Sequence, residues 1–422
     1  MKKKICLFIF IAIAAILLLF DGAVKVYGWG KTWMGYDLEM IVQEARLKVG
    51  PFRIKPVLLL NNIGYDSNVY YGTATEPIKD YTITAGPGFT IYLPLKKKII
   101  FQVYESPQYV YYFETKRERT WNNYFNGQVH FVFNRLVFSF GRGFSDARER
   151  WNTEIDIRPR RKEDSFQGSV LWQPSRKTSF SLSYRRANYD YENIHYEIFN
   201  VRDRLNREEN YVNFTGLYQL SYRVKFFLDV EYGFFDFLNP SNFRDSKSYT
   251  IYGGFEFSPF GIVRGRINLG YKYFNPLDPQ RKDYRGIAGN TNVSIKMLKF
   301  LDLRASYRRD VQFSLWYNNA YFIENIYGIG TSLYLFKNIR LDYDYSLGRN
   351  KYPVADIQGL NQDGGILLKR QDDYKIHSVG IYFRLKKNIG IGAIASKWIR
   401  DSNLDWEDDE RVFIGLNLTY NF

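Results

Sequence analysis

The sequence has little cysteine and histidine, and each scarcity argues against a class of functional site. Cys6 is the only cysteine and lies near the start, so the chain can form no internal disulfide and has no thiol further along. Only three histidines are present (His130, His195 and His377), and no spacing places one beside a nucleophile and an orienting residue. We therefore expect no enzyme, metal site or cofactor, although side chains from different strands could still converge into a catalytic group.

Long apolar runs are missing after the first 20 residues, so no transmembrane helix is expected there. At the start, Lys2 to Lys4 precede an apolar run of 16 residues from Ile5 to Phe20, and small or apolar residues follow at 26–28. This pattern predicts a secretory signal peptide over residues 1–28. The alternative is an uncleaved anchor, but the run is shorter than the roughly 20 residues that a membrane-crossing helix needs.

Aromatic residues are abundant, at 18% of the chain, while the mean hydropathy is polar at −0.37. Repeated segments alternate apolar and polar residues with a period of two, as in residues 300–308, 339–346 and 263–273. Successive side chains of a strand point to opposite faces, so each segment has one apolar face and one polar face. A soluble sandwich alternates in the same way, but a membrane barrel also explains the aromatics, which gather at its lipid face and interfaces.

The spacing of turns favours the barrel. Short basic or Pro/Gly breaks fall near Lys96, Arg135, Ser175, Arg223, Phe260, Lys299, Asn338 and Lys387, at intervals of 37–49 residues, with a longer polar stretch between each pair. Outer-membrane barrels are built from short periplasmic turns and long external loops. We predict an all-β, transmembrane antiparallel up-and-down barrel over residues 53–422, with about 18 strands (16 being the alternative) and both ends periplasmic.

Residues 29–52 are expected to form a periplasmic N-terminal segment before the barrel. Within it, Asp37 to Lys48 carries one apolar helical face, and Gly50-Pro51 ends the pattern. This short amphipathic helix could occlude the lumen, dock a periplasmic partner or rest against the barrel mouth.

The C-terminus is the most specific motif. Alternate residues backward from the end form one apolar face: Phe422, Tyr420, Leu418 and Leu416. An amphipathic last strand that ends in Phe resembles the signal read by the barrel assembly machinery, to which it would offer an extended edge. We therefore expect that machinery to be a partner and the outer membrane to be the location.

Charge gives the remaining indication. The chain carries 59 Lys and Arg against 44 Asp and Glu, and part of this charge falls on the polar faces expected to line the pore. The expected lining residues are Arg185, Arg264, Arg266, Arg304, Arg308, Arg340, Arg384, Asp302, Asp342 and Asp344. Arginine rings favour anions. The alternative is that these charges pair across strands and fill a hydrated interior.

A resemblance to a known family is carried by residues 50–56 (Gly-Pro-Phe-Arg-Ile-Lys-Pro) and 61–70 (Asn-Asn-Ile-Gly-Tyr-Asp-Ser-Asn-Val-Tyr). They resemble the opening strand of the β-barrel porin type 2 superfamily, some of whose members accompany polysaccharide export or exosortase systems. The resemblance implies a porin-like barrel and brings no functional residues with it.

We expect a channel that passes or exports polar, anionic solutes or polysaccharide. The alternative is a non-conducting scaffold for an export complex, with loops such as 145–163 or 349–370 folded inward. Outer-membrane lipid and lipopolysaccharide are expected partners, the latter through basic clusters at 116–119, 148–150 and 158–162. Location excludes nucleic acid, and the oligomeric state is left open.

Overall fold

The computed structural model describes residues 45, 47–72, 76–95, 98–196, 198–259, 261–316, 318–357 and 367–421. The expected signal peptide over residues 1–28, and most of the expected helix over 37–48, lie outside these residues. The last two residues of that expected helix, Leu47 and Lys48, instead belong to the short strand β1 (Leu47–Val49), which folds back on β2 across Gly50-Pro51. Among the described residues, no helix is long and apolar enough to cross a membrane.

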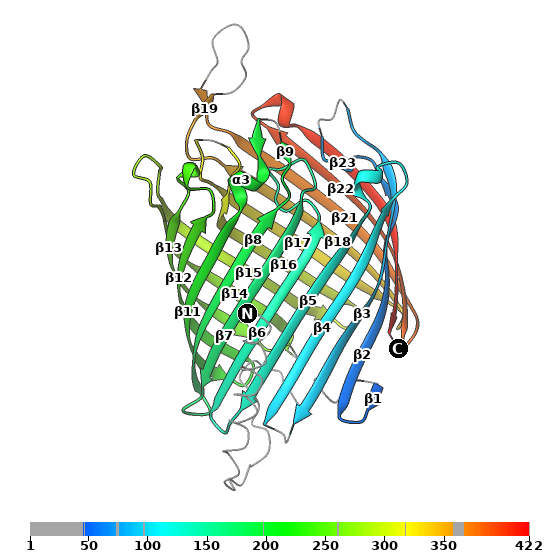
Figure 1. The fold of residues 1–422 in the computed structure, drawn as a ribbon. Coiled ribbons are helices and arrows are strands. Elements are labelled where there is room, and N and C mark those ends of the chain that lie inside the picture. Colours follow the sequence, from blue (N-terminus) through cyan, green and yellow to red (C-terminus); the bar gives the residue numbers. More distant parts are fainter. Residues whose placement is uncertain are drawn as a thin grey trace, which may run out of the picture.

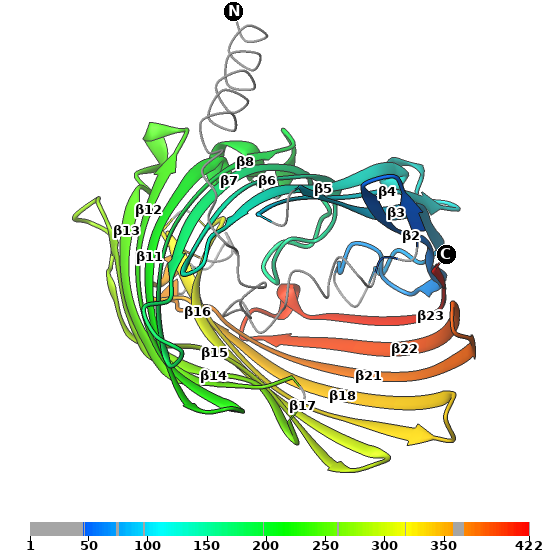
Figure 2. The ribbon, with the colours of Figure 1, turned by 90° about the horizontal axis from the view of Figure 1, so that it is seen from below.

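The main sheet has 19 strands, of which β1 pairs with β2 alone; the other 18 are antiparallel neighbours that close into one barrel (Figures 1 and 2). The first barrel strand closes on the last one, β23, so the predicted count of 18 is confirmed. The barrel strands are β2 (Phe52–Asp66), β3 (Asp80–Leu95), β4 (Ile99–Tyr112), β5 (Thr120–Val132), β6 (Leu136–Arg148), β7 (Arg160–Trp172), β8 (Thr178–Tyr191), β11 (Arg207–Ser221), β12 (Val224–Phe237), β13 (Ser246–Phe257), β14 (Val263–Pro276), β15 (Tyr284–Leu298), β16 (Leu301–Phe313), β17 (Tyr321–Leu335), β18 (Ile339–Lys351), β21 (Gln371–Lys386), β22 (Ile389–Ser402) and β23 (Asp409–Asn421).

Short elements decorate the long-loop end, at the top of Figure 1. They are η1 (Lys116–Glu118), β9 (His195–Tyr196), β10 (Phe199–Asn200), α3 (Val201–Leu205), η2 (Pro240–Asn242), β19 (Asp356–Ile357), β20 (Leu367–Leu368) and η3 (Asp405–Glu407). The eight expected tight turns all fall between consecutive barrel strands at the opposite end. The chain therefore alternates long and short connections, as the sequence predicted.

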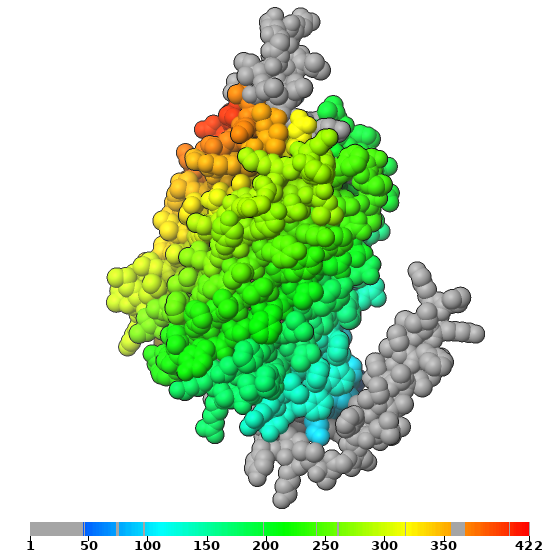
Figure 3. Space-filling model, turned by 90° about the vertical axis from the view of Figure 1, so that its left-hand side faces the viewer, coloured from blue at the N-terminus to red at the C-terminus, as the bar shows by residue number. Residues whose placement is uncertain are grey.

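Side chains alternate between the two faces of the barrel wall, as β13 and β14 illustrate. Ile251 pairs with Tyr271, and both are more than half exposed on the outward face, whereas the neighbouring pair of Thr250 and Lys272 points inward and is buried. Figure 3 shows the outer face over the green strands as a continuous wall. An apolar band outside and a polar interior suit a barrel whose outer face contacts lipid.

The last strand places its apolar face outward. Leu416 is 50% exposed, and Leu418 and Tyr420 alternate with it along β23 on the same side of the strand. Phe422 lies outside the described residues. The role of these four residues as an assembly signal stays a prediction.

Candidate functional site

The long-loop half of the lumen is filled by connections that fold inward. The loop over residues 149–159, between β6 and β7, is visible as the blue-green segment inside the ring of strands in Figure 2. Its residues Glu154 and Ile155 have no exposed surface. The segment 314–316, between β16 and β17, meets this loop, since Glu154 accepts hydrogen bonds from the Ser314 hydroxyl and the Leu315 N–H. We call residues 149–159 and 314–316 together the outer plug.

An apolar core holds the outer plug against the wall. Ile155 and Leu315 are buried in one cluster with Ala187, Tyr189 and Tyr191 of β8 and with Val201 and Leu205 of α3. Burying one such aliphatic side chain stabilises the packed state by roughly 2 kcal/mol. The long-loop half is thus packed like the core of a soluble domain in this region.

Tryptophans belong partly to this core, although the sequence also suggested an interfacial girdle. Trp151 packs against the cluster, and Trp316 meets Phe199 edge to face with ring centroids 5.6 Å apart. Trp121 and Trp172 are 59% and 48% exposed on outward faces, where they fit the girdle. The first two are therefore plug residues, and the last two are wall residues.

Buried ion pairs fasten the plug to the far wall. The Asp156 carboxylate lies 2.7 Å from the Arg150 guanidinium and 2.5 Å from that of Arg400 on β22. Arg400 also contacts Asp409, 2.9 Å away. Close by, Arg370 pairs with Glu407 at 2.8 Å. The side chains of Arg370, Arg400, Glu407 and Asp409 are almost fully buried. Such pairs are costly to break, because removing one partner leaves a buried charge behind.

Two arginines satisfy the backbone of the plug. Arg244, 1% exposed, donates to the carbonyl oxygens of Ser314, Trp316 and Asn319, and Arg204 donates to those of Leu315 and Trp316. Burial, reinforced by the nearby Arg204, holds the pKa of Arg244 well below its ordinary value. Buried carbonyls need such donors, so the arginines fix the course of this segment.

Glu154 is a buried carboxylate that makes no salt bridge within 4.0 Å among the described residues. Burial raises the pKa of Glu154, against the opposing effects of Arg370 and the hydrogen bonds from Ser314 and Leu315. Glu154 therefore binds a proton more tightly in the plug than a glutamate side chain does in water.

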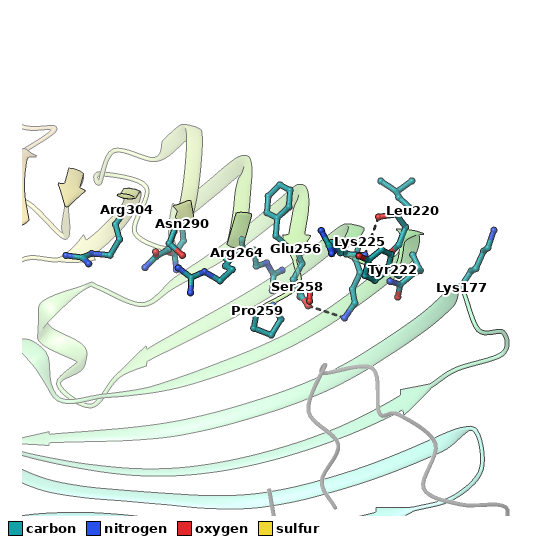
Figure 4. Close-up of a pocket in the computed structure, with 18 of the residues that line it drawn as sticks. Lys177, Leu220, Tyr222, Lys225, Glu256, Ser258, Pro259, Arg264, Asn290 and Arg304 are labelled. Carbon is teal, nitrogen blue, oxygen red and sulfur yellow. Dashed lines mark hydrogen bonds and ion pairs between the residues drawn. The ribbon is translucent and has the colours of Figure 1, made fainter. Parts of the chain in front are cut away.

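The short-turn half of the lumen, in contrast, contains a cavity of about 1890 Å³. Among the described residues, nine lysine or arginine side chains and three carboxylates line it. Figure 4 shows Lys225, Arg264 and Arg304 in a row along its wall, from β12, β14 and β16. We call this cavity the basic vestibule; its cationic residues are Arg135, Arg176, Lys177, Arg223, Lys225, Arg264, Arg266, Arg304 and Arg340.

A glycine shapes the vestibule wall between two of these arginines. Gly265 has a φ of +111°, and a Cβ there would lie 2.1 Å from the carbonyl oxygen of Asn292. Only glycine tolerates both the angle and the close approach, so Gly265 lets β14 lie this close to Asn292 between Arg264 and Arg266.

The vestibule brings together six of the ten residues expected to line the pore, each of which touches its surface. They are Arg264, Arg266, Arg304, Arg340, Asp302 and Asp342. They are also paired: Arg264 lies 2.8 Å from Asp302, and Arg340 lies 3.0 Å from Asp342. Arg266 is 3.9 Å from Asp229 and stacks on Phe227. Arg264 and Arg266 thus pair across strands, as in the pairing alternative left open from the sequence, whereas Arg340 pairs within its own strand, β18.

The other four expected lining residues do not line the vestibule. Asp344 accepts from Arg304 at 2.8 Å, and Arg308 lies 3.5 Å from Glu324. Arg185 lies 2.9 Å from Glu163, farther toward the long loops. Arg384 borders a second, smaller cavity.

The vestibule cations without an acidic partner come from the tight turns, whose sequence pattern predicts strand boundaries but does not by itself place their side chains in the lumen. Arg135, Arg176, Lys177 and Arg223 are exposed, and no carboxylate lies within 4.0 Å of them in the described part of the chain. The signal was in the sequence, because the turns at 133–135, 173–177 and 222–223 contain basic residues and no Asp or Glu. These four cations give the mouth of the basic vestibule a net positive charge, and we call them the rim.

No group of three or more His, Cys, Asp or Glu that could hold a metal ion occurs among the described residues. His130 bonds to Ser139 through its Nδ1, and the His377 Nδ1 lies 3.2 Å from the Tyr343 hydroxyl. Neither contact supplies a nucleophile, base and orienting residue together.

Several solved structures align with most of this chain at low sequence identity. The outer membrane protein OpdK of Pseudomonas aeruginosa is 8% identical, with a TM-score of 0.47 over 87% of this chain and 98% of that one. OpdQ of the same organism is 9% identical, with a TM-score of 0.48 over 87% and 97%. The siderophore receptor PirA of P. aeruginosa is 10% identical, with a TM-score of 0.42 over 87% and 80%. No curated protein sequence matches the chain.

The match to a family is direct. The model of the family described as "Putative beta-barrel porin 2" covers residues 175–422, from the third tight turn to the C-terminus. This is more than half of the chain and includes most of the vestibule wall. The protein is therefore a porin-like barrel of the outer membrane and belongs to this β-barrel porin family.

Proposed function

We propose that this barrel passes small anionic solutes, which collect in the basic vestibule on the periplasmic side. The excess of nine cationic side chains over three carboxylates around one cavity carries the proposal. Short turns of outer-membrane barrels face the periplasm, so the vestibule opens there. A mouth with one sign of charge and low-dielectric walls concentrates ions of the opposite sign.

The rim and the inner wall contribute differently to this selectivity. The paired arginines, such as Arg264 and Arg304, have part of their charge neutralised by neighbouring aspartates. The rim cations Arg135, Arg176, Lys177 and Arg223 have no acidic partner among the described residues, so their positive charge is not neutralised. We therefore assign most of the anion preference to the rim, and the pairs mainly keep the wall polar and hydrated.

A second candidate is a non-conducting scaffold barrel of an export system. The packed outer plug is the observation that favours it, because its apolar core closes part of the long-loop half. Under the channel proposal, solutes cross only when the plug moves or beside it. Both candidates, the channel and the scaffold, are favoured over catalysis, and assembly is assigned to recognition of the last strand.

Planar-bilayer recording in a KCl gradient tests the channel. The variant Arg176→Gln/Lys177→Gln/Arg223→Gln removes three rim charges, and its anion-to-cation permeability ratio should fall toward one. The difference should shrink in 1 M salt, where the Debye length is about 3 Å. A wild-type protein that is folded but never conducts contradicts the channel and supports the scaffold.

A charge-matched control changes three cations on the outward face: Arg285→Gln/Arg349→Gln/Lys375→Gln. These residues share that face with the exposed Ile287 and Leu347, so they lie outside the lumen. The control should leave selectivity unchanged. If it lowers the permeability ratio as much as the rim variant does, then net charge, not the vestibule, sets the preference.

A further inference from the structure

A second cavity, of about 370 Å³, lies at the short-turn end where β17, β18, β21, β22 and β23 meet. Ligand sites in proteins begin at about this size. Its lining contains five cationic side chains and, within the described residues, no Asp or Glu. The cations are Lys337, Arg340, Arg384, Lys386 and Lys387. The balance of charge is therefore more one-sided than in the basic vestibule.

The floor of this cavity is recessed by glycines. Nothing lies within 4 Å of a Cβ built on Gly390, so the absent side chain leaves open space. A Cβ on Gly392 would lie 2.7 Å from the Tyr382 ring, so only glycine allows that ring to lie against the strand. The Arg340 guanidinium lies 4.4 Å from the centre of the same ring. The recess thus has a polar aromatic edge and an open base.

An amide is held in place at the recess by the closing seam of the barrel. The Asn417 Oδ1 accepts a hydrogen bond of 3.0 Å from the backbone N–H of Asn62. Asn62 adopts a φ of +52° in the irregular stretch between Leu60 and Ile63, where β2 and β23 shift register. Because its oxygen is occupied, Asn417 has its NH2 group left to donate, and that group makes no other hydrogen bond among the described residues.

Four of the five cations of the recess have no acidic partner among the described residues. Arg340 pairs with Asp342 at 3.0 Å, but no carboxylate lies within 4.0 Å of Lys337, Arg384, Lys386 or Lys387 among the described residues. A cavity whose walls carry donors and positive charge, and no negative charge, is complementary to an oxyanion. Guanidinium and ammonium groups bind phosphate and carboxylate with short, charge-assisted hydrogen bonds.

We propose that this oxyanion recess binds a phosphate- or carboxylate-bearing solute at the periplasmic mouth. The proposal rests on the proposed function, because it assigns an entry site to the same class of solute. Tyr334 and Arg340 line both the recess and the basic vestibule. A bound anion therefore sits beside the vestibule and can pass into it along one continuous surface.

Isothermal titration calorimetry on the folded full-length chain in detergent, at low ionic strength, tests the recess with two probes, inorganic phosphate and citrate. Asn417→Asp keeps an oxygen for the Asn62 N–H but replaces the donor with a negative charge. Lys386→Gln/Lys387→Gln removes two of the cations. Each variant should weaken binding of the preferred probe at least tenfold, and the probe that binds tighter identifies the anion class.

The matched control is Arg285→Gln/Arg349→Gln, which removes two cations from the outward face of the wall, outside both the recess and the basic vestibule. It should change the dissociation constant less than twofold. Binding of neither probe, or equal weakening in the control, overturns the recess. Calorimetry needs no current, so a protein that binds but never conducts contradicts the proposed function and leaves the recess standing. An anion-selective channel whose binding is unchanged by Asn417→Asp contradicts the recess alone.

Discussion

Replacing Asp156 with Asn tests whether buried ion pairs hold the outer plug in place. In the wild type, one Asp156 oxygen accepts from Arg150 at 2.7 Å, and the other accepts from Arg400 at 2.5 Å and from the Tyr196 hydroxyl at 3.2 Å. An asparagine has the same shape, but its NH2 group would face a guanidinium that can only donate. One arginine therefore loses its contact with the negative charge of residue 156 while it stays largely buried.

The size of the effect follows from that burial. Breaking a buried ion pair by removing one partner costs about 3 to 5 kcal/mol. Arg400 keeps Asp409 at 2.9 Å, so the lower value is the better expectation. Because about 1.4 kcal/mol changes an equilibrium tenfold, local opening of the plug should become at least a hundredfold more frequent.

Hydrogen–deuterium exchange measures this opening, since amides of the plug exchange when it opens locally. Protection over residues 150–158 should fall at least a hundredfold in Asp156→Asn, and protection in the central barrel strands should stay as it is. The control is Asp283→Asn, whose partner Arg285 is 64% exposed, so that water and salt screen the pair and its loss should cost little. If protection falls less than threefold in Asp156→Asn, or falls equally in the control, then the Asp156 ion pairs do not hold the outer plug in place.

Two further predictions concern the plug carboxylate and the last strand. Since burial raises the pKa of Glu154, its folded state holds a proton more tightly than its unfolded state, and protection of the plug should decline as the pH rises above 4.5. After correction for intrinsic exchange, plug protection in Glu154→Gln should depend less on pH. If the pH dependence is unchanged, other groups cause the decline. Leu416→Lys places a charge on the outward face and should cost about 2 to 4 kcal/mol of folding free energy in lipid vesicles. The inward-facing Ser378→Lys, opposite Asp344, should cost far less in the same urea titration; equal costs would contradict the assignment of faces.

The barrel itself could be predicted from the sequence because its signals are local. Alternation identifies a strand within a dozen residues, and the tight turn at Arg223 or Lys299 separates two such strands in two or three positions. Counting these units gave the strand number. The period of two also places Leu416 outside and Arg304 inside without any knowledge of the neighbours.

The pairing of the lumen charges could not be predicted in the same way. Arg264 meets Asp302, and Arg304 meets Asp344, two strands away across the wall. Which residues face each other depends on the register of every intervening pair, and a register shift such as that between Lys296 and Leu298 is not visible in the alternation. The sequence therefore predicted six residues of the vestibule wall, but neither their pairing nor the cations of the tight turns at the vestibule mouth.

The outer plug was hardest to predict because it depends on distant segments. The alternative of inward-folded loops was stated from the sequence, and the loop at 149–159 fits it, but nothing in that loop is periodic. Its ion pair connects Asp156 with Arg400, 244 positions later, and its apolar core packs Ile155 together with Leu315. Contacts of that separation follow from closure of the barrel, which brings the two halves of the chain face to face.

The inward folding of the loops has a consequence for the side that faces the environment. Ile198 is 86% exposed at the surface, yet the next residue, Phe199, is 8% exposed and packs on Trp316, and Val201 is fully buried in the plug core. Residues that antibodies or phages would meet are thus covalent neighbours of residues that close the lumen. A substitution in such a loop that prevents recognition can also disturb a neighbouring side chain that packs in the plug, so fewer substitutions are tolerated there. The external face of this barrel should therefore diversify more slowly than loops that only project into solvent.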